Sequence, residues 1–364
     1  MNIIIFFIIL LVLILVHEFG HFFSAKRFGI RVDEFGFGFP PKIKGWKRGE
    51  TEYSLNILPF GGFVRIFGEN PDEENTNGLD KERSFVNKPK WQQAIVLFAG
   101  VFANFILAWL LFSVGFISGL PTSVGSELSG YELENVNLTV VAVLPEYPAA
   151  EAGLKSGDKI ISVQSGPDSI AEINPDNLKS FIVTHGNEEI QIGYLRGKNT
   201  EIQNTTLVPQ STDGEPAIGI SMDQIGTAKL PVIPALWEGL RLDWALTKTT
   251  AYGLYNFIYQ GLAGRGSLND VTGPVGLVGI IGNAYEFGFV YLLSFTALIS
   301  VNLAIINLLP FPALDGGRLL FLFIEKVKGS RLNPKFANAA NLLSFALLII
   351  FMLVVTWNDV AKLL

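Results

Sequence analysis

The chain has 364 residues and a formal net charge of −6, and 49% of its residues are hydrophobic while only 16% are charged. With a mean hydropathy of +0.38, this composition is typical of a protein that crosses a membrane several times and carries a modest soluble part, and it excludes an ordinary soluble enzyme. The absence of cysteine excludes disulfides and thiolate metal sites, so a metal would need His, Asp or Glu ligands. We expect no nucleic-acid partner.

The N-terminal segment, residues 3–16, consists almost entirely of hydrocarbon side chains and leads into the motif HEFGH at residues 17–21. The first basic residue, Lys26, follows this segment, so a cleaved secretory signal is not expected. Two histidines four residues apart lie about 40° apart on one helical face, where both can bind one Zn²⁺ while the intervening glutamate holds a water. In a soluble chain such a motif can be a plain exposed helix face. At membrane depth ionisable groups cost about 2 to 3 kcal/mol each and are usually functional, so His17, Glu18 and His21 indicate zinc-dependent hydrolysis.

Four apolar segments are long enough to cross ~30 Å of hydrocarbon as helices. Lys and Arg are unevenly distributed between them, because residues 25–90 hold 12 whereas residues 119–290 hold 9 in more than twice the length. The positive-inside rule then places both termini and the long insert outside the cytoplasm. The expected spans are residues 3–25, 93–118, 291–309 and 336–357.

The first cytoplasmic connection contains two apolar, glycine-rich runs, at residues 35–41 and 53–67. Non-helical backbone at membrane depth is tolerated only beside protein or a water-filled cavity, so we expect a membrane re-entrant β-hairpin next to the metal site. A small cytoplasmic sheet outside the bilayer is the alternative. In the hairpin interpretation, an edge of the hairpin can pair with an extended substrate by strand addition.

The long insert is expected to form alternating strands between residues 135 and 226. Residues 145–158 resemble the strand, short helix and turn of bacterial PDZ domains, and residues 217–220 resemble the ligand-binding loop and strand of a circularly permuted PDZ domain. His185 in this insert is expected to be a solvated turn residue and not a metal ligand. The expected strands include residues 139–144, 159–163 and 189–194, and the residues that match the PDZ pattern are Pro148, Ala149, Ala152, Gly153, Leu154, Gly157 and Asp158.

Residues 235–262 follow the insert and carry Trp and Tyr at spacings that suggest one or two amphipathic helices at the outer membrane surface. The third zinc ligand is expected from a later span, where Asp315 stands in the run NLLPFPALDGGR of residues 307–318. Two prolines interrupt the helix there, and two glycines permit a bend or a close approach. A surface turn at the end of the helix is the alternative for Asp315.

Together these residues resemble the site-2 protease family of intramembrane zinc metalloproteases, and within it the bacterial regulator-of-sigma branch. Two details depart from that family: the insert has room for one PDZ domain where some members carry two, and Gly100-Val101 stands where the family often has Gly-Pro. The resemblance covers nearly the whole chain. It is carried by residues 17–21 (HEFGH), 61–62 (GG), 100–104 (GVFAN), 273–276 (GPVG) and 307–316 (NLLPFPALDG).

The resemblance implies a metalloendopeptidase in which Zn²⁺ is bound by His17, His21 and Asp315, and Glu18 is the general base. Its substrates would be single-span membrane proteins, such as membrane-anchored anti-sigma factors or remnant signal peptides, cut inside the bilayer of the bacterial cytoplasmic (inner) membrane. The PDZ domain would bind a peptide tail or screen substrates by size. The candidate substrate-binding residues are Asn302, Asn307, Gly61 and Gly62, although a structural bond between helices is equally open for the two asparagines; Asn104 is expected to be a packing residue.

The predicted fold class is therefore a polytopic α-helical membrane protein with four transmembrane helices, a membrane re-entrant β-hairpin and an inserted extracytoplasmic PDZ domain of the α+β type. A non-catalytic PDZ scaffold with a structural metal is disfavoured because it would not need Glu18. A metal transporter is disfavoured because the four spans contain no detectable inverted repeat. The expected parts are residues 1–118 (first half of the protease core), 119–228 (PDZ domain), 229–290 (interfacial helices and linker) and 291–364 (second half of the core).

Overall fold

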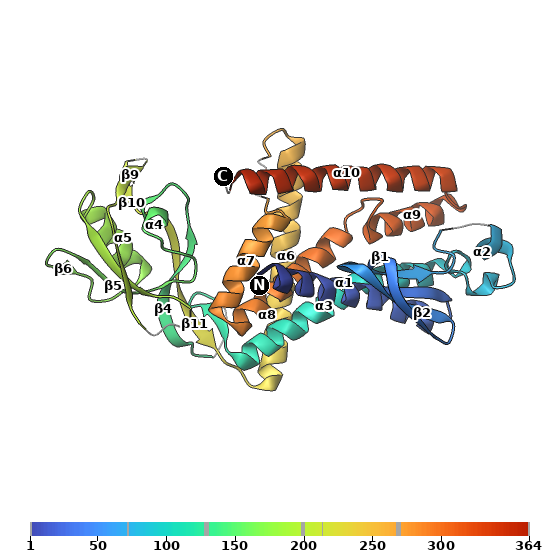
Figure 1. Cartoon of the computed structure of the whole chain (residues 1–364), viewed down its shortest axis with the longest axis horizontal. Helices are drawn as coiled ribbons and strands as arrows, with labels where there is room; N and C mark the ends of the chain where they lie inside the picture. Colours follow the sequence, from blue (N-terminus) through green and yellow to red (C-terminus); the bar gives the residue numbers. More distant parts are fainter. Residues whose placement is uncertain are drawn as a thin grey trace. The chain divides into compact units, whose positions relative to one another are not determined.

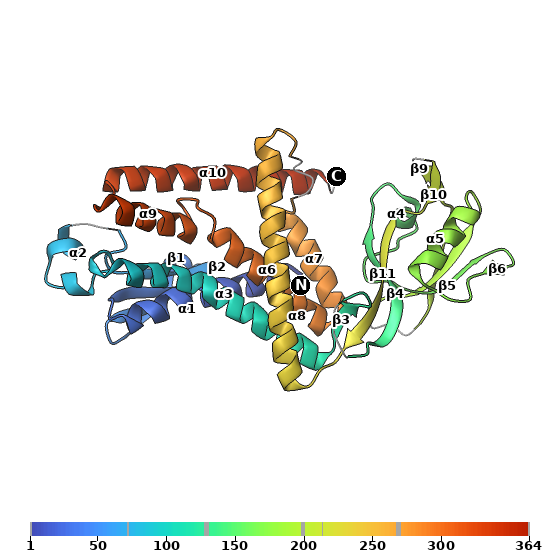
Figure 2. The same cartoon turned by 180° about the vertical axis from the view of Figure 1, so that it is seen from behind.

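The computed structural model describes residues 2–70, 73–126, 131–197, 201–212, 214–266 and 271–362. The chain divides into two compact units, each built from segments that are distant in the sequence. Figures 1 and 2 show their elements from opposite sides. Unit 1 comprises Met1–Leu111, Gly239–Gly282 and Phe295–Leu364, and unit 2 comprises Phe112–Glu238 and Asn283–Ser294.

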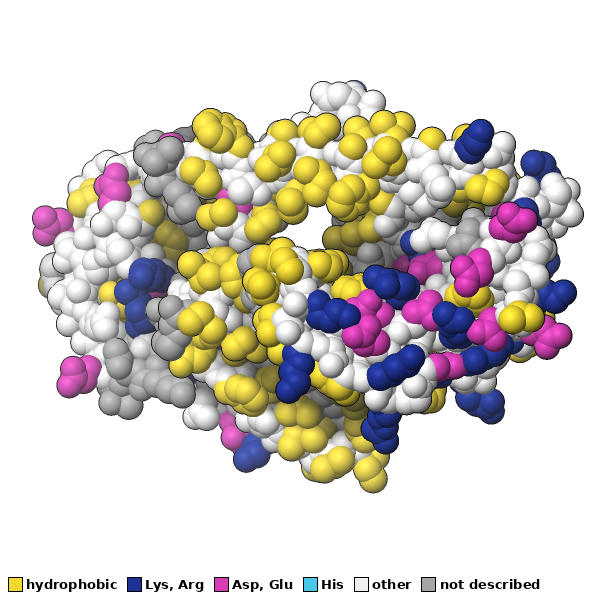
Figure 3. Space-filling view, turned by 45° about the vertical axis from the view of Figure 1, so that its right-hand side comes forward, with side chains coloured by type: hydrophobic (Ala, Val, Ile, Leu, Met, Phe, Trp, Pro, Cys, Tyr) yellow, Lys and Arg dark blue, Asp and Glu magenta, His cyan; other side chains and the backbone are white. Residues whose placement is uncertain are grey.

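Four helices among the described residues are long and apolar enough to cross a membrane, and they coincide with the four expected spans. Large apolar side chains on the surfaces of these helices are exposed. On the last of them, Leu342 is 71% exposed and Trp357 is 76% exposed. Apolar surface of this extent is typical of contact with lipid. On the face drawn in Figure 3, hydrophobic side chains form broad areas that carry few charges. The four helices are α1 (Asn2–Arg27), α3 (Lys90–Ser118), α8 (Phe289–Asn307) and α10 (Pro334–Ala361).

The two glycine-rich runs form the long strands β1 (Val32–Arg48) and β2 (Thr51–Ile66), which pair with each other. Phe35 is in register with both Val64 and Tyr53, so the strands fold back and residues 62–66 lie at one edge of the sheet. The expected β-hairpin is therefore present in the structure, while its depth in a membrane stays a prediction.

This edge lies against the apolar part of α1. A Cβ atom added to Gly62 would be 2.9 Å from Cδ2 of Leu15, and one added to Gly61 would be 3.3 Å from Cδ1 of Ile14. The sheet thus approaches α1 less than one turn before the HEFGH motif.

A small core joins the elements of unit 1 that surround this motif. It includes Ala25 of α1, Val32 and Ile66 of the sheet, Val96 of α3 and Leu322 of α9, all of which are buried. Since these elements share one core, their relative positions are fixed at the end of α1. Among the described residues outside the insert, α6 is one continuous helix where the sequence predicts one or two. The remaining helices there are α2 (Glu73–Asn77), η1 (Lys81–Arg83), η2 (Phe85–Asn87), α6 (Val232–Leu262), α7 (Pro274–Phe287) and α9 (Asp315–Lys328).

Unit 2 contains a sheet with the strand order β3-β11-β4-β5-β7-β8. Leu138, Val140, Ile160, Leu178 and Ile192 are in its core. Strands are present where the sequence predicts them, and the short helix of the PDZ-like run is α4. The bounds are β3 (Leu120–Ser123), β4 (Glu134–Val143), α4 (Pro148–Glu151), β5 (Lys159–Ser165), β6 (Asp168–Ser169), α5 (Pro175–Thr184), β7 (Ile190–Leu195), β8 (Gln203–Leu207), β9 (Gln210–Thr212), β10 (Glu215–Ala217) and β11 (Ile220–Ala228).

His185 is buried, so the expectation of a solvated turn residue is wrong. It caps the C-terminus of α5, where Nδ1 donates to the Phe181 carbonyl oxygen at 3.0 Å and the ring stacks on the Phe181 ring. The Phe181 carbonyl oxygen accepts this bond in addition to the backbone N–H of His185. His185 belongs to no cluster of potential metal ligands among the described residues.

Candidate active site

The two histidines of α1 meet α3 across a close helix contact. A Cβ atom added to Gly20 would lie 2.2 Å from the Ala99 carbonyl oxygen, and one added to Gly100 would lie 2.3 Å from Nε2 of His21. Only glycine permits this approach, because a methyl group would overlap the backbone or the ring. His17 and His21 are each only 7% exposed, so both imidazoles are surrounded by protein atoms.

Asp315 completes a cluster of three potential metal ligands with these histidines. Its Oδ2 atom is 2.9 Å from Nε2 of His17 and 3.2 Å from Nε2 of His21, and the two Nε2 atoms are 3.2 Å apart. Ligand atoms about 2.05 Å from a tetrahedral zinc ion lie about 3.3 Å from one another, so these three atoms have separations that fit zinc. A site with three protein ligands also leaves one coordination position open, as in catalytic zinc sites.

The second ring nitrogen of each histidine has its own neighbour on α3. Nδ1 of His21 donates to the Val96 carbonyl oxygen at 2.8 Å. Nδ1 of His17 lies 3.4 Å from Nδ2 of Asn104, and Oδ1 of Asn104 is buried without a hydrogen-bond partner. The oxygen and nitrogen of an amide have nearly the same size. If the Asn104 side chain is flipped so that Oδ1 and Nδ2 change places, Oδ1 accepts a hydrogen bond from the Nδ1–H of His17.

A histidine that donates through Nδ1 presents an unprotonated Nε2 to a metal, and each of the two rings has a neighbour on α3 for this Nδ1–H. The expected packing role of Asn104 is therefore incomplete, because the residue also contacts the imidazole of a potential metal ligand, His17. Ser300 of α8 donates to the Asn104 carbonyl oxygen at 2.9 Å, which ties the same point of α3 to the helix that leads to Asp315.

Asp315 is the first residue of α9, at the end of an irregular connection from α8. Pro310 and Pro312 cannot donate the backbone bonds that would continue α8. A Cβ atom added to Gly316 would lie 2.2 Å from the Leu308 carbonyl oxygen, and the next glycine is equally confined. The chain therefore folds tightly back on itself here and holds the carboxylate beside the histidines.

Glu18 lines a cavity of about 220 Å³ that adjoins His17 and Asp315. The backbone N–H of Val64 hydrogen-bonds the Glu18 carboxylate, so the sheet edge and α1 meet beside the three potential metal ligands. Asn307 also lines this cavity, whereas Asn302 does not. The substrate-binding role expected of these asparagines stays a prediction.

The geometry combines an H-E-x-x-H helix, a third ligand from a distant segment and a carboxylate beside the open position, and the sequence comparison agrees with it. The profile of peptidase family M50 matches residues 5–351. The chain belongs to peptidase family M50. This is the family of the site-2 proteases, so the resemblance inferred from the motifs is confirmed, and the protein is a zinc metalloprotease.

Several relatives match this M50 chain over nearly its whole length. A candidate zinc metalloprotease of Clostridium perfringens is 34% identical over 349 residues, which cover 96% of this chain and 95% of that protein. The regulator of sigma-W protease RasP of Bacillus subtilis is 30% identical, and the alignment covers 100% of this chain and 99% of that protein. Among solved structures, the PDZ domain of an SdrC-like protein from Listeria monocytogenes aligns at 22% identity with 25% of this chain and 92% of that chain, with a TM-score of 0.21.

Sequence reasoning missed four contributors to this M50 site. The Val64 N–H and the Val96 carbonyl are backbone groups, which leave no signal in residue identity. The role of Asn104 had a weak signal, since an amide in an apolar span needs a hydrogen-bond partner. The close contact between α1 and α3 had a stronger signal in Gly20 and Gly100, because small residues in two spans predict that the helices cross closely.

Proposed function

We propose that this protein is an intramembrane endopeptidase that hydrolyses peptide bonds within the membrane helices of single-span proteins. The observation that carries the proposal is the position of the metal ligands, because His17 and His21 lie on α1, an apolar helix long enough to span a bilayer. A protease acting on soluble substrates would gain nothing from burying its ligands in such a helix. His17, His21 and Asp315 would hold the zinc ion.

A zinc ion held by these three residues would polarise the scissile carbonyl group and make water a stronger nucleophile. Glu18 then acts as the general base: it accepts a proton from the attacking water and delivers it to the leaving amine. The Val64 N–H bond to its carboxylate keeps Glu18 oriented toward the open position. Asn307, at the wall of the same cavity, is suited to donate to a substrate carbonyl oxygen.

A peptide bond inside a helix is protected because its carbonyl already accepts a hydrogen bond, so the substrate must unwind before cleavage. The edge at residues 62–66 offers replacement bonds. The Val64 N–H points away from the sheet toward Glu18, and alternation along a strand puts the backbone groups of Gly62 on the same outward side. We infer that the unwound substrate pairs along this edge and passes Glu18, with the hairpin re-entering the membrane beside α1.

Unit 2 would act outside the cytoplasm as a PDZ-type domain that binds a substrate tail or excludes bulky outer domains. A relative is named as a regulator of sigma-W, which favours membrane-anchored anti-sigma factors as substrates, with remnant signal peptides as a second source of single apolar helices. The bacterial cytoplasmic membrane is the expected location.

The direct test replaces Glu18 by Gln and co-expresses the variant with a single-span membrane substrate. Loss of the general base should lower cleavage by at least about 10²-fold, while the zinc content of the purified protein stays at the level of the unmodified chain. Glu74→Gln is the matched control, because Glu74 is an exposed residue of α2. Undiminished cleavage by Glu18→Gln would contradict the proposal.

A further inference from the structure

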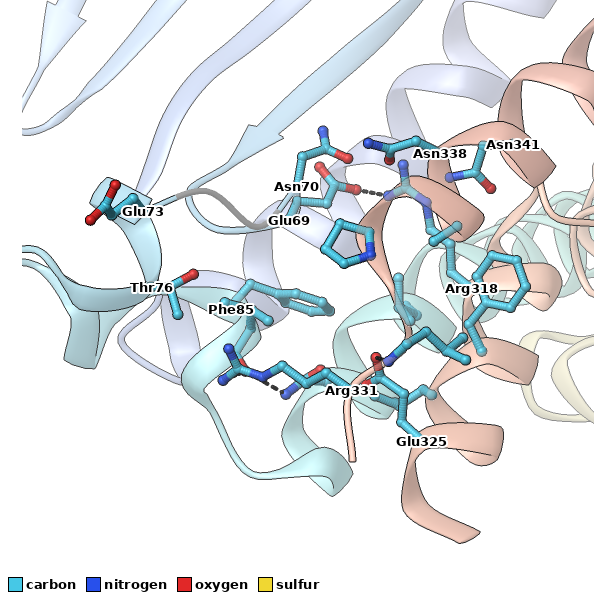
Figure 4. A pocket seen from close by; sticks show the side chains of 18 of the residues that line it. Glu69, Asn70, Glu73, Thr76, Phe85, Arg318, Glu325, Arg331, Asn338 and Asn341 are labelled. Carbon is cyan, nitrogen blue, oxygen red and sulfur yellow. Dashed lines mark hydrogen bonds and ion pairs between the residues drawn. The ribbon is translucent and has the colours of Figure 1, made fainter. Parts of the chain in front are cut away.

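A second and larger cavity lies in unit 1, with a volume of about 520 Å³. It is lined by residues of the connection after β2, of α2 and η2, of the start of α3, of α9, of the connection to α10 and of the first turns of α10 (Figure 4). Its lining shares no residue with the catalytic cavity. A volume of this size is within the range of cavities that hold ligands, and no step of the proposed hydrolysis uses it.

The cavity begins one helical turn from the metal ligand on α9. Arg318, in its wall, is three residues after Asp315, a rise of about 4.5 Å along the helix. Arg318 forms an ion pair with Glu69, which lies three residues after the end of β2. The segment that carries the third ligand and the segment that leaves the sheet edge therefore meet at this wall. A substrate strand that follows residues 62–66 toward the end of β2 is directed to the cavity.

The lining is rich in side-chain amides. An Asn or Gln amide presents a donor and an acceptor together, which matches the N–H and C=O groups of an extended peptide. Oδ1 of Asn341 is buried without a hydrogen-bond partner, and Asn338 stands one turn before it on the same face of α10. Figure 4 shows these two amides and Asn70 around the Arg318–Glu69 pair. The lining amides are Asn70, Asn77, Gln93, Asn338 and Asn341.

The lining holds one carboxylate that is available to a basic side chain of a ligand. Of its three carboxylates, Glu69 is paired with Arg318 and Glu325 with Lys90, while the second lining arginine, Arg331, hydrogen-bonds the Val86 carbonyl oxygen and Oδ1 of Asn87. The third, Glu73, forms no ion pair with any described residue and is exposed. Segments that flank membrane helices on the cytoplasmic side are enriched in Lys and Arg, and such a segment would bring a cation to Glu73.

We propose that this cavity is a substrate subsite that binds the extended, basic segment flanking the substrate's membrane helix on the cytoplasmic side, a few residues beyond the scissile bond. The inference rests on the proposed intramembrane cleavage. Backbone groups of the segment bond to the amides of Asn338 and Asn341, and one of its basic side chains pairs with Glu73. The subsite anchors the polar end of a helix whose apolar part must unwind.

The test uses the full-length protein in proteoliposomes with three single-span substrates that share one apolar segment and differ only in the cytoplasmic flank, which is Lys-rich, Ser/Gly-rich or Glu-rich. For the Lys-rich substrate, Asn341→Leu and Glu73→Lys should each lower kcat/KM by about 3- to 10-fold. For the Ser/Gly-rich substrate, Glu73→Lys should change kcat/KM less than 2-fold. Glu74→Lys is the matched control, because it makes the same change of charge on the same helix at a residue outside the lining.

A second readout is binding of a fluorescent Lys-rich flank peptide to the Glu18→Gln protein. Binding should weaken in Glu73→Lys and be unchanged in Glu74→Lys. The subsite is overturned if Glu73→Lys and Glu74→Lys have equal effects, if the Glu-rich flank is preferred, or if the peptide does not bind although the unmodified protein cleaves its substrates. If the unmodified protein cleaves none of the three substrates, the proposed function itself fails.

Discussion

At the scale of single residues, Asn104 connects the orientation of the proposed metal ligand His17 to the packing of α3. Its amide is the neighbour of the His17 Nδ1–H, while Ser300 donates to its carbonyl oxygen. Partners of this kind fix which ring nitrogen carries the proton and raise the affinity for the metal. The bond to His17 needs an acceptor oxygen, and a side chain of similar shape without one would leave the N–H unpaired.

Replacing Asn104 by Leu should therefore lower zinc affinity by about 10- to 100-fold, measured by competition with a chelator on the purified protein. Asn104→Asp keeps an acceptor in the same place and should retain most of the affinity. If the Leu variant bound zinc as tightly as the Asp variant, Asn104 would be a packing residue only.

His185 gives a prediction about pH in unit 2. The hydrogen bond to the Phe181 carbonyl raises the pKa of His185 above its ordinary value of 6.5, and Asp168 adds to this effect. A raised folded-state pKa means that the stabilisation is fully present below pH 6.5 and is lost as the pH rises through the folded-state pKa. Histidine NMR on the full chain, with His185→Gln for assignment, should give a pKa above 6.5; a value at or below 6.5 would contradict this account.

At the scale of elements, the edge of β2 is the part of the fold that would contact both Glu18 and the substrate in the proposed function. A Cβ atom at Gly62 would lie 2.9 Å from the Gly36 carbonyl oxygen and 2.9 Å from Leu15. Gly62→Ala should displace the edge and lower kcat by about 10²-fold, since a shift of about 1 Å near the reacting atoms has effects of this size.

Gly253→Ala in α6 is the matched control for this change, because a Cβ atom there meets open space. Zinc content should be equal in the two variants, which separates a displaced strand from a lost metal. Equal activity of the two variants would contradict the role given to the edge.

The local patterns of the chain predicted most elements but not their contacts. HEFGH and the proline- and glycine-rich run before α9 are visible in the sequence because each needs specific residues at fixed spacing. The Val64 bond to Glu18 is not visible, since any residue except proline supplies an N–H. The burial of His185 was also missed, because a polar residue directly after a helix is typical of an exposed turn. Only the structure shows that the His185 ring packs on Phe181.

At the scale of the whole molecule, the site depends on packing between segments that are far apart in the chain. His17 and Asp315 are 298 positions apart and their side chains are 2.9 Å apart. Hydropathy predicts each span separately, since a backbone in lipid must satisfy its own hydrogen bonds as a helix. It does not say which spans touch, and that information is carried by small residues such as Gly20 and Gly100 at their crossing.

The most direct test of the central claim is the position of the cut in a purified single-span substrate, determined by mass spectrometry of both fragments after reaction in proteoliposomes. The account predicts a cut inside the apolar segment that is absent with Glu18→Gln and lost when zinc is removed from the metal ligands. A cut confined to the polar flanks, or one that persists in Glu18→Gln, would contradict it.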